Sequence, residues 1–181
     1  MKIEDKLLLD INKSIDGEGF ICGGALRNYF EGTKPRDIDI FMKTDDENLF
    51  DKLCEKLFKE FSIQDIDWKA LQGNLNNLGN YYSYEFFTKN NIIISIIKPQ
   101  ILYGRKCYGD ITTLVDEIDF NVCRLGLNKD NTIYCPEPIE ETIQHIKNKS
   151  LKIMTKRPEE RNRTIRRLEK YQTYGYKLIL N

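Results

Sequence analysis

Residues 20–41 have the sequence FICGGALRNYFEGTKPRDIDIF, and this stretch decides the fold. It opens with a short apolar strand over Phe20–Cys22, which runs into two glycines. Residues Ala25–Phe30 have the pattern of a short helix, closed by Gly32. Residues Arg36–Met42 then alternate polar and apolar side chains, which is typical of a half-buried strand. The stretch therefore predicts strand, glycine turn, helix and strand in that order.

Two aspartates on the second of these strands point the same way. Side chains alternate between the faces of a strand, so Asp37 and Asp39 share one face while Ile38 and Ile40 face the core. Their α-carbons are roughly 7 Å apart, from two strand rises. Adjacent like charges repel, and a divalent cation is the usual reason to keep them together. The pair therefore predicts a magnesium site, with one ion bound or two ions bridged.

The glycines Gly23 and Gly24 lie between an apolar strand and a helix N-terminus. Glycine lets the backbone approach a ligand closely, and the free N–H groups of a helix start favour phosphate. Arg27, one turn into the helix, can add a charge-assisted contact to the same phosphate. An Asp-x-Asp alone is usually a solvated strand face and a Gly-Gly alone usually a turn. Their occurrence in order within one segment favours the functional interpretation.

The pattern Gly-Gly, twelve residues, then Asp-Ile-Asp-Ile resembles the signature of the DNA polymerase beta nucleotidyltransferase superfamily. More narrowly, residues 21–28 with 36–39 resemble the head domain of class II CCA-adding enzymes and bacterial poly(A) polymerases. The resemblance implies two Mg²⁺ ions on catalytic carboxylates, together with a nucleoside triphosphate. It assigns the carboxylates to Asp37 and Asp39, the triphosphate loop to Gly23 and Gly24, and further nucleotide contacts to Arg27 and Arg36.

The sequence leaves open which residue, if any, supplies a third catalytic carboxylate. Residues 119–123, Asp-Phe-Asn-Val-Cys, resemble the family's second strand motif, which makes Asp119 a candidate catalytic carboxylate or nucleotide contact. The alternative is a strand-start acid that faces solvent. The family's other acidic position falls near Ser95, where this chain has no carboxylate.

Residues 157–176 resemble the arginine-rich neck helix that follows the family's head domain. Pro158 is a good first-turn residue and opens a helix that runs to about Tyr174. Arg163 and Arg166 are candidate nucleotide contacts on it, near Arg167 and Lys170 at helical spacing. Salt bridges on a solvated helix face are the alternative. The sequence stops before the helical body that grips tRNA in full-length relatives, so we expect complete CCA addition only with a partner's help.

The rest of the chain fits an α+β fold, with a mixed β-sheet flanked by helices and a C-terminal helical, neck-like extension. Further helices are expected at Glu4–Ile15, after Asp45 and Asp46, at Asp110–Glu117 and around Ile139, Ile143 and Ile146. Further strands are expected at Ile63–Trp68, Tyr82–Phe87, Ile92–Ile97, Ile118–Leu127 and Thr132–Cys135, with a loop at Leu71–Gly79. We expect a head domain over residues 1–150 and the extension over 151–181.

Composition narrows the function classes. The 181 residues carry 28 basic and 28 acidic side chains, so no overall basic field marks the chain as a nucleic-acid binder. Five scattered cysteines and a single histidine, His145, do not suit a structural zinc site. No apolar run has the length of a signal or membrane segment, which favours a cytoplasmic protein with no membrane partner. The oligomeric state stays open.

The expected function is a metal-dependent transfer of a nucleoside monophosphate from a triphosphate to an acceptor hydroxyl, with RNA as acceptor. Two alternatives remain. One is a catalytically weak or inactive nucleotide- or RNA-binding module on the same fold, supported by Ser95, by Asn28 where the family usually has an acid, and by the missing body. The other is nucleotidylation of a protein or small molecule.

Overall fold

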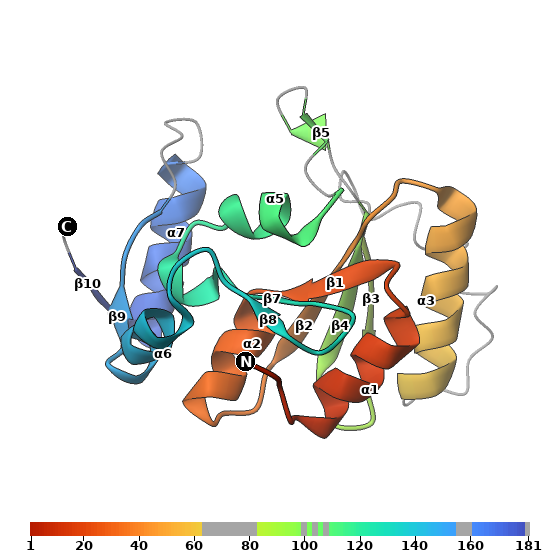
Figure 1. Ribbon diagram of the computed structural model, residues 1–181, viewed down its shortest axis with the longest axis horizontal. Helices are drawn as coiled ribbons and strands as arrows, with labels where there is room; N and C mark the ends of the chain where they lie inside the picture. Colours follow the sequence, from red (N-terminus) through yellow and green to blue (C-terminus); the bar gives the residue numbers. More distant parts are fainter. Residues whose placement is uncertain (63–82, 99–100, 103–104, 107–108, 155–160, 180–181) are drawn as a thin grey trace.

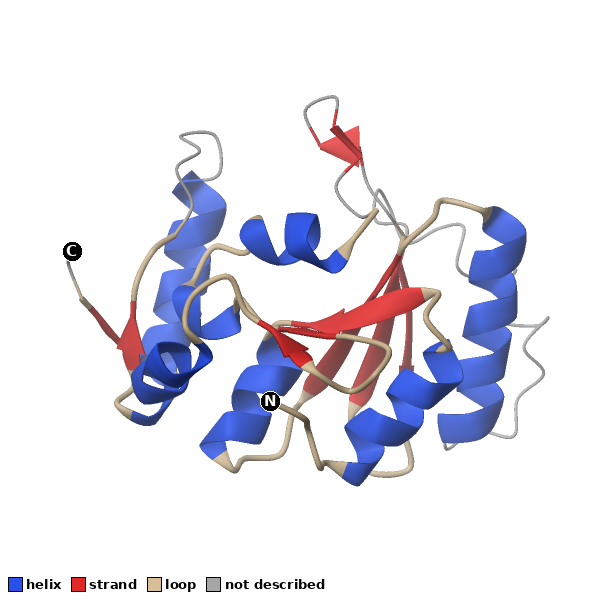
Figure 2. Ribbon diagram, viewed as in Figure 1, coloured by secondary structure: helices blue, strands red, loops and turns tan. Residues whose placement is uncertain are grey.

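The computed structural model describes residues 1–62, 83–98, 101–102, 105–106, 109–154 and 161–179. Helices pack against both faces of a mixed sheet, which confirms the predicted α+β fold (Figure 1, Figure 2). The strands of this sheet are β1 (Gly19–Cys22), β2 (Asp37–Met42), β3 (Ser83–Phe87), β4 (Ile93–Ile97), β7 (Gly126–Leu127) and β8 (Ile133–Tyr134). The helices are α1 (Lys6–Ile15), α2 (Gly24–Glu31), α3 (Glu47–Phe61), α5 (Ile111–Asp116), α6 (Ile139–Lys147) and α7 (Arg161–Thr173).

The sheet places β2 at its centre. Its strand order is β3-β4-β2-β1-β7-β8, and within it β2 and β4 run parallel while the other pairs are antiparallel. Two short pairs lie outside it: β5 (Ile101–Leu102) with β6 (Arg105–Lys106), and β9 (Ser150–Leu151) with β10 (Lys177–Leu178). A central strand is buried on both edges, so the position of its side chains is tightly fixed.

Local chemistry sets the helix ends. The carboxylates of Asp5 and Asp46 accept the backbone N–H groups of Leu8 and Leu49, which caps α1 and α3 at their N-termini. Helix α2 ends where Gly32 takes a left-handed conformation with φ 69°. Glycine adopts that conformation without the steric penalty of a Cβ atom, which favours the predicted closure at Gly32.

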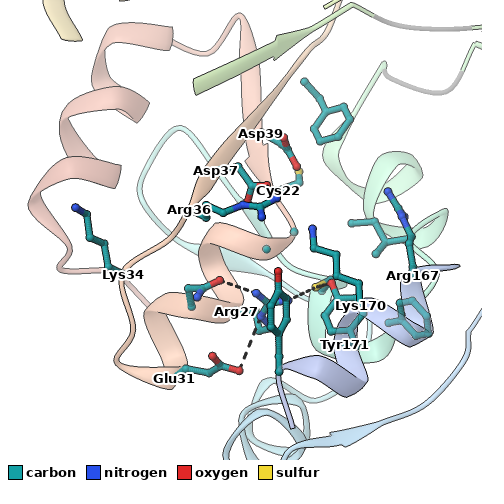
Figure 3. A pocket seen from close by; sticks show the side chains of 18 residues that line it. Cys22, Arg27, Glu31, Lys34, Arg36, Asp37, Asp39, Arg167, Lys170 and Tyr171 are labelled. Atoms are coloured by element: carbon teal, nitrogen blue, oxygen red, sulfur yellow. Dashed lines mark hydrogen bonds and ion pairs between the residues drawn. The ribbon is translucent and has the colours of Figure 1, made fainter. Parts of the chain in front are cut away.

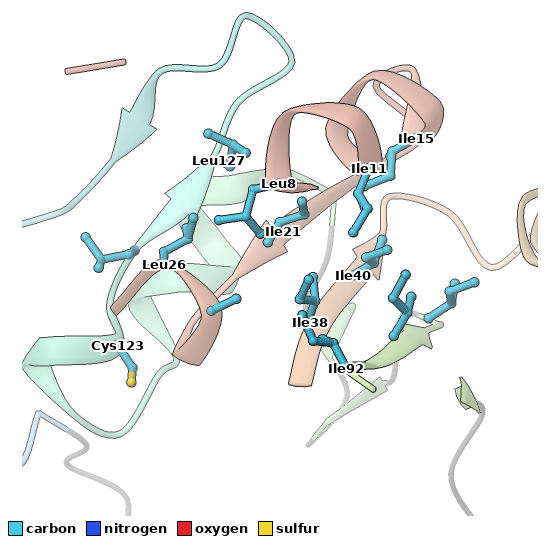
Figure 4. Packing of buried hydrophobic residues seen from close by; sticks show 14 of the residues in the cluster. Leu8, Ile11, Ile15, Ile21, Leu26, Ile38, Ile40, Ile92, Cys123 and Leu127 are labelled. Carbon is cyan, nitrogen blue, oxygen red and sulfur yellow. The ribbon is translucent and has the colours of Figure 1, made fainter. Parts of the chain in front are cut away.

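The core lies between the sheet and three helices. Ile38 and Ile40 of β2 are 0% exposed and belong to one buried cluster with apolar residues of α1, α2 and α3, part of which Figure 4 shows. A second, smaller cluster forms on the other face, where α5 packs Ile111, Leu114 and Val115 around Phe20 and Cys22. The face of β2 that carries the aspartates therefore has a helix over only part of it, as Figure 1 shows for α5.

Most predicted elements are found within a residue or two of their expected ends, but the strand predicted at Ile118–Leu127 is wrong. The structure has a short 3₁₀ helix, η1 (Asn121–Cys123), followed by the two-residue strand β7. Asn121 breaks the strand because its side-chain oxygen accepts the backbone N–H of Lys152, a partner 31 positions away. The predictions at Ile63–Trp68 and Leu71–Gly79, and the helix start at Pro158, lie outside the described residues.

The C-terminal segment packs on the rest of the chain. Strand β10 pairs in parallel with β9, and the ring of Tyr171 in α7 lies edge-on to Phe120 with 5.0 Å between centroids. The contacts that reach elements before residue 150 include this ring contact and the N–H of Met154, which donates to the carbonyl of Asp119 at 2.7 Å. The division at residue 150 stays a prediction.

Candidate active site

Strand β2 positions the two aspartates as the alternation predicted. Asp37 and Asp39 are partly exposed, whereas Ile38 and Ile40 are fully buried on the opposite face. Asp39 lies between two neighbours in the sheet, Cys22 on β1 and Ser95 on β4. The pair therefore stands on the central strand of the sheet, held from both sides by backbone hydrogen bonds.

A cavity of about 480 Å³ opens in front of this pair (Figure 3). Its volume is within the range of sites for small ligands and cofactors. Charged side chains make up much of its lining, five of them basic and three acidic. These are Arg27, Lys34, Arg36, Arg167 and Lys170, with Glu31, Asp37 and Asp39. They come from the α2 helix, the loop between α2 and β2, the β2 strand and the α7 helix, as Figure 3 shows.

The glycine turn borders the cavity next to the carboxylates. Gly23 has φ 81°, a conformation that favours glycine, and a side chain built at Gly24 would put its Cβ 4.0 Å from Asp37 Oδ1. The N–H of Gly23 donates to the carbonyl of Leu125 at 2.9 Å, so this amide is already paired within the fold. An anion at this turn would be bound by the amides of the first turn of α2.

Arg27 lines the cavity but is nearly enclosed by tyrosines. It is 7% exposed, and its guanidinium carbon lies 5.1, 5.7 and 6.0 Å from the ring centres of Tyr171, Tyr174 and Tyr176. Such distances allow cation–π attraction. Its Nη2 donates to Asn28 Oδ1 at 2.7 Å, while Nε makes no hydrogen bond among the described residues and lies 3.9 Å from Glu31 Oε1. A buried donor of this kind can bind an anion that enters the cavity.

The electrostatics of the site centre on Asp39. Burial raises its pKa from 3.8 to about 6, and the neighbouring charge of Asp37 adds to the increase. Glu85 also raises this pKa, whereas Arg167 and Lys170 on α7 lower it. The carboxylate pair is therefore only partly neutralised by its basic neighbours, which suits a cation between them.

Asp119, the candidate third carboxylate, does not line the cavity. It is 0% exposed, and Arg167 Nη1 contacts its Oδ2 at 3.0 Å. Its neighbours in the chain, Ile118 and Phe120, do line the cavity. The alternative of a solvent-facing acid is thus wrong. A catalytic role for Asp119 stays a prediction.

The remaining predicted nucleotide contacts, all of them arginines, differ in whether they line the cavity. The side chain of Arg36 is 72% exposed at the cavity edge, with Nη2 3.9 Å from Asp37 Oδ2. Arg166 is exposed and is absent from the described lining, and the side chain of Arg163 lies outside the described residues. The sequence did not lead us to expect that Tyr171 and Tyr174 line the cavity. Their spacing was the available signal, because positions 167, 171 and 174 share one helix face.

The residues fit a divalent cation in the nature of their donors, since hard cations prefer carboxylate oxygens. Among the described residues no three or more His, Cys, Asp or Glu side chains are already grouped closely enough to hold a metal. Asp37 and Asp39 would supply two of the ligands such a cation needs. Among the residues that the structure describes, no helix is long and apolar enough to cross a membrane.

Solved structures of CCA-adding enzymes share this fold. The Thermotoga maritima CCA-adding enzyme complexed with tRNA matches with a TM-score of 0.62 at 14% identity, over 99% of this chain and 41% of that one. A CCA-adding enzyme with CTP gives 0.65 at 15% identity, over 98% and 41%. The Bacillus stearothermophilus enzyme with CTP gives 0.57 at 16% identity, over 94% and 40%. The chain thus spans about two fifths of their length.

Comparison of the sequence with known proteins and protein families identifies one family. No curated protein matches the chain. The family model described as "Gabija anti-defense 2 family protein" matches residues 2–149, which include both aspartates, the glycine turn and Arg27. The chain, with its nucleotidyltransferase-like fold, therefore belongs to the Gabija anti-defense 2 family.

Proposed function

We propose that this protein transfers a nucleoside monophosphate from a nucleoside triphosphate to an acceptor hydroxyl. One observation carries the proposal: Asp37 and Asp39, the glycine turn and a set of basic side chains all line the same cavity of about 480 Å³. A cation site beside an anion site is what a metal-bound triphosphate requires. The CCA-adding enzymes of the same fold, solved with CTP and ATP, support a nucleotide at this position.

Each group would have a distinct task. Asp37 and Asp39 would hold Mg²⁺, which activates an acceptor hydroxyl and stabilises charge on the transferring phosphate when bound. The amides at the start of α2 and the Nε of Arg27 would bind phosphate oxygens. Arg36, Arg167 and Lys170 would neutralise the remaining charge of the triphosphate.

Two acceptors have specific support. RNA is favoured by the fold, because a CCA-adding enzyme that shares it was solved with tRNA. A protein acceptor is favoured by the family match, whose description names an action against Gabija. Nucleotidylation of a component of that defence would then be the biological activity.

The test is label transfer. The full chain is incubated with Mg²⁺ and each α-labelled nucleoside triphosphate, in parallel with total RNA, with proteins of the Gabija system and with small-molecule hydroxyl compounds. We expect label on one acceptor, reduced at least 100-fold in Asp37→Asn/Asp39→Asn, because the cation ligands are lost. Asp10→Asn, an exposed ion-pair residue on α1, is the matched control and should retain activity.

The outcomes separate the alternatives. Labelled RNA supports the first acceptor and labelled protein the second. Triphosphate binding without transfer to any acceptor would contradict the enzyme and favour the nucleotide-binding module. Equal transfer by the wild-type chain and the double aspartate variant would place the chemistry elsewhere.

A further inference from the structure

Four side chains form a row across the sheet at the level of the site. The register pairs Cys22 with Asp39, Asp39 with Ser95, and Ser95 with Glu85, so the row crosses β1, β2, β4 and β3. Residues directly opposite each other on neighbouring strands project to the same face. Glu85 therefore shares the face of Asp39, two strands away, or about 10 Å between α-carbons from two strand spacings.

Ser95 draws the carboxylate of Glu85 toward Asp39. Its Oγ donates to Glu85 Oε1 at 3.2 Å, which holds this carboxylate against β4 rather than out beyond the edge strand β3. Ser95 is 5% exposed and its side chain is short, so no bulky group stands between Glu85 and Asp39 in the row. The negative charge of Glu85 already acts on Asp39, whose pKa it helps to raise.

We propose that Glu85 is a third carboxylate ligand for the cation held by Asp37 and Asp39, reaching over Ser95. This inference rests on the proposed function. The position next to Asp39 on β4 has no carboxylate, and Glu85 supplies one from the next strand with a longer side chain. Because the described carboxylates are not yet grouped around a metal position, Glu85 has to change rotamer to join them. Its side chain is exposed, so this change meets little resistance.

A simpler role competes with this one. Among the described strands β3 is at the edge of the sheet, and charged side chains on edge strands prevent pairing with other chains. That role needs a charge at position 85 and makes no demand on cation binding. The hydrogen bond to Ser95 argues against it as the whole explanation, since a carboxylate that only blocks the edge gains nothing by turning inward.

The test measures cation binding directly. Free Mn²⁺ is followed by electron paramagnetic resonance during titration of the full chain without nucleotide. We expect Glu85→Gln to weaken Mn²⁺ binding by about tenfold or more, since loss of even a supporting residue around a metal typically costs 10–100-fold. Glu140→Gln, an exposed glutamate on α6, is the control and should bind Mn²⁺ as the wild type does. Urea midpoints of both variants verify that they are folded.

A rescue variant tests the placement. Ser95→Asp in the Glu85→Gln background puts a carboxylate beside Asp39 and should restore Mn²⁺ affinity. Affinity that stays at the level of Glu85→Gln alone would overturn the proposed route over Ser95.

The two proposals fail in different ways. If Glu85→Gln binds Mn²⁺ like the wild type while Asp39→Asn does not, the role of Glu85 is refuted and the proposed function stands. If the wild type itself binds no Mn²⁺, both proposals fall.

Discussion

At Asp39, burial and the neighbouring charge of Asp37 both raise the pKa of the carboxyl group. The carboxyl group of the folded chain keeps its proton to about pH 6, whereas its ordinary pKa is 3.8. Between these values the folded chain binds more protons than the unfolded one, so this group lowers the free energy of unfolding as the pH rises through that window. The carboxylate pair therefore costs stability at neutral pH, and a bound cation would reduce that cost.

This cost can be measured with Asp39→Asn. In urea denaturation with EDTA at pH 7.5, we expect the variant to be more stable than the wild type by about 1–3 kcal/mol, from a shift of about two pKa units. The difference should shrink to near zero below pH 4, where both states of the wild type are protonated. Mg²⁺ at pH 7.5 should raise the midpoint of the wild type alone. A difference that does not change with pH would contradict this account.

Among the elements, α7 is linked to the residues before it by an ion pair to a buried aspartate. Asp119 is fully buried and its Oδ2 lies 3.0 Å from Arg167 Nη1, while the arginine side chain is 48% exposed. Removing the cation leaves a buried carboxylate with one fewer partner. The arginine is half in solvent, so the penalty is moderate.

We expect Arg167→Met to lower the free energy of unfolding by about 1–3 kcal/mol in urea. Arg166→Met, next to it on α7 and exposed, should change it by less than about 0.5 kcal/mol. In the double variant Asp119→Asn/Arg167→Met part of the loss should be recovered, since no buried charge remains. Losses that simply add in the double variant would show that the two side chains do not interact.

The elements also show what the sequence can predict. The α2 and β2 elements were predicted because their periodicity, their glycines and their Asp-Ile-Asp alternation are all local signals. The strand predicted at Ile118–Leu127 failed because Asn121 binds the backbone of Lys152. For Arg27 the sequence predicted only a phosphate contact, because its tyrosine partners lie some 145 positions further along the chain. In both cases the deciding partner is remote in sequence.

For the whole molecule, the question is whether residues 151–181 are an appendage or part of the head. The rings of Tyr171 and Tyr176 enclose Arg27, and the hydroxyl of Tyr176 donates to Glu31. Lys149 binds the same glutamate at 2.7 Å. One wall of the proposed nucleotide site is thus built by the last 30 or so residues of the sequence.

A chain cut after Met154 should therefore be much less stable. Burial of two tyrosines is worth about 2 kcal/mol each, so we expect a loss of about 4 kcal/mol or more in urea denaturation. A chain cut after Tyr176 keeps these rings, loses only the β10 pairing, and should lose less. Equal urea midpoints for the full chain and the chain cut after Met154 would show that the segment is an independent appendage.

The alternation along β2 has a consequence for how the protein can change over time. Odd positions, Asp37 and Asp39, serve the cavity, and even positions, Ile38 and Ile40, serve the interior. Substitution within either set leaves the direction of the other set unchanged, so each face can change its amino acids without turning the other. An insertion or deletion of one residue would exchange the two sets at once. Length variation within residues 37–42 should therefore be absent among functional descendants of this gene, even where their amino acids differ.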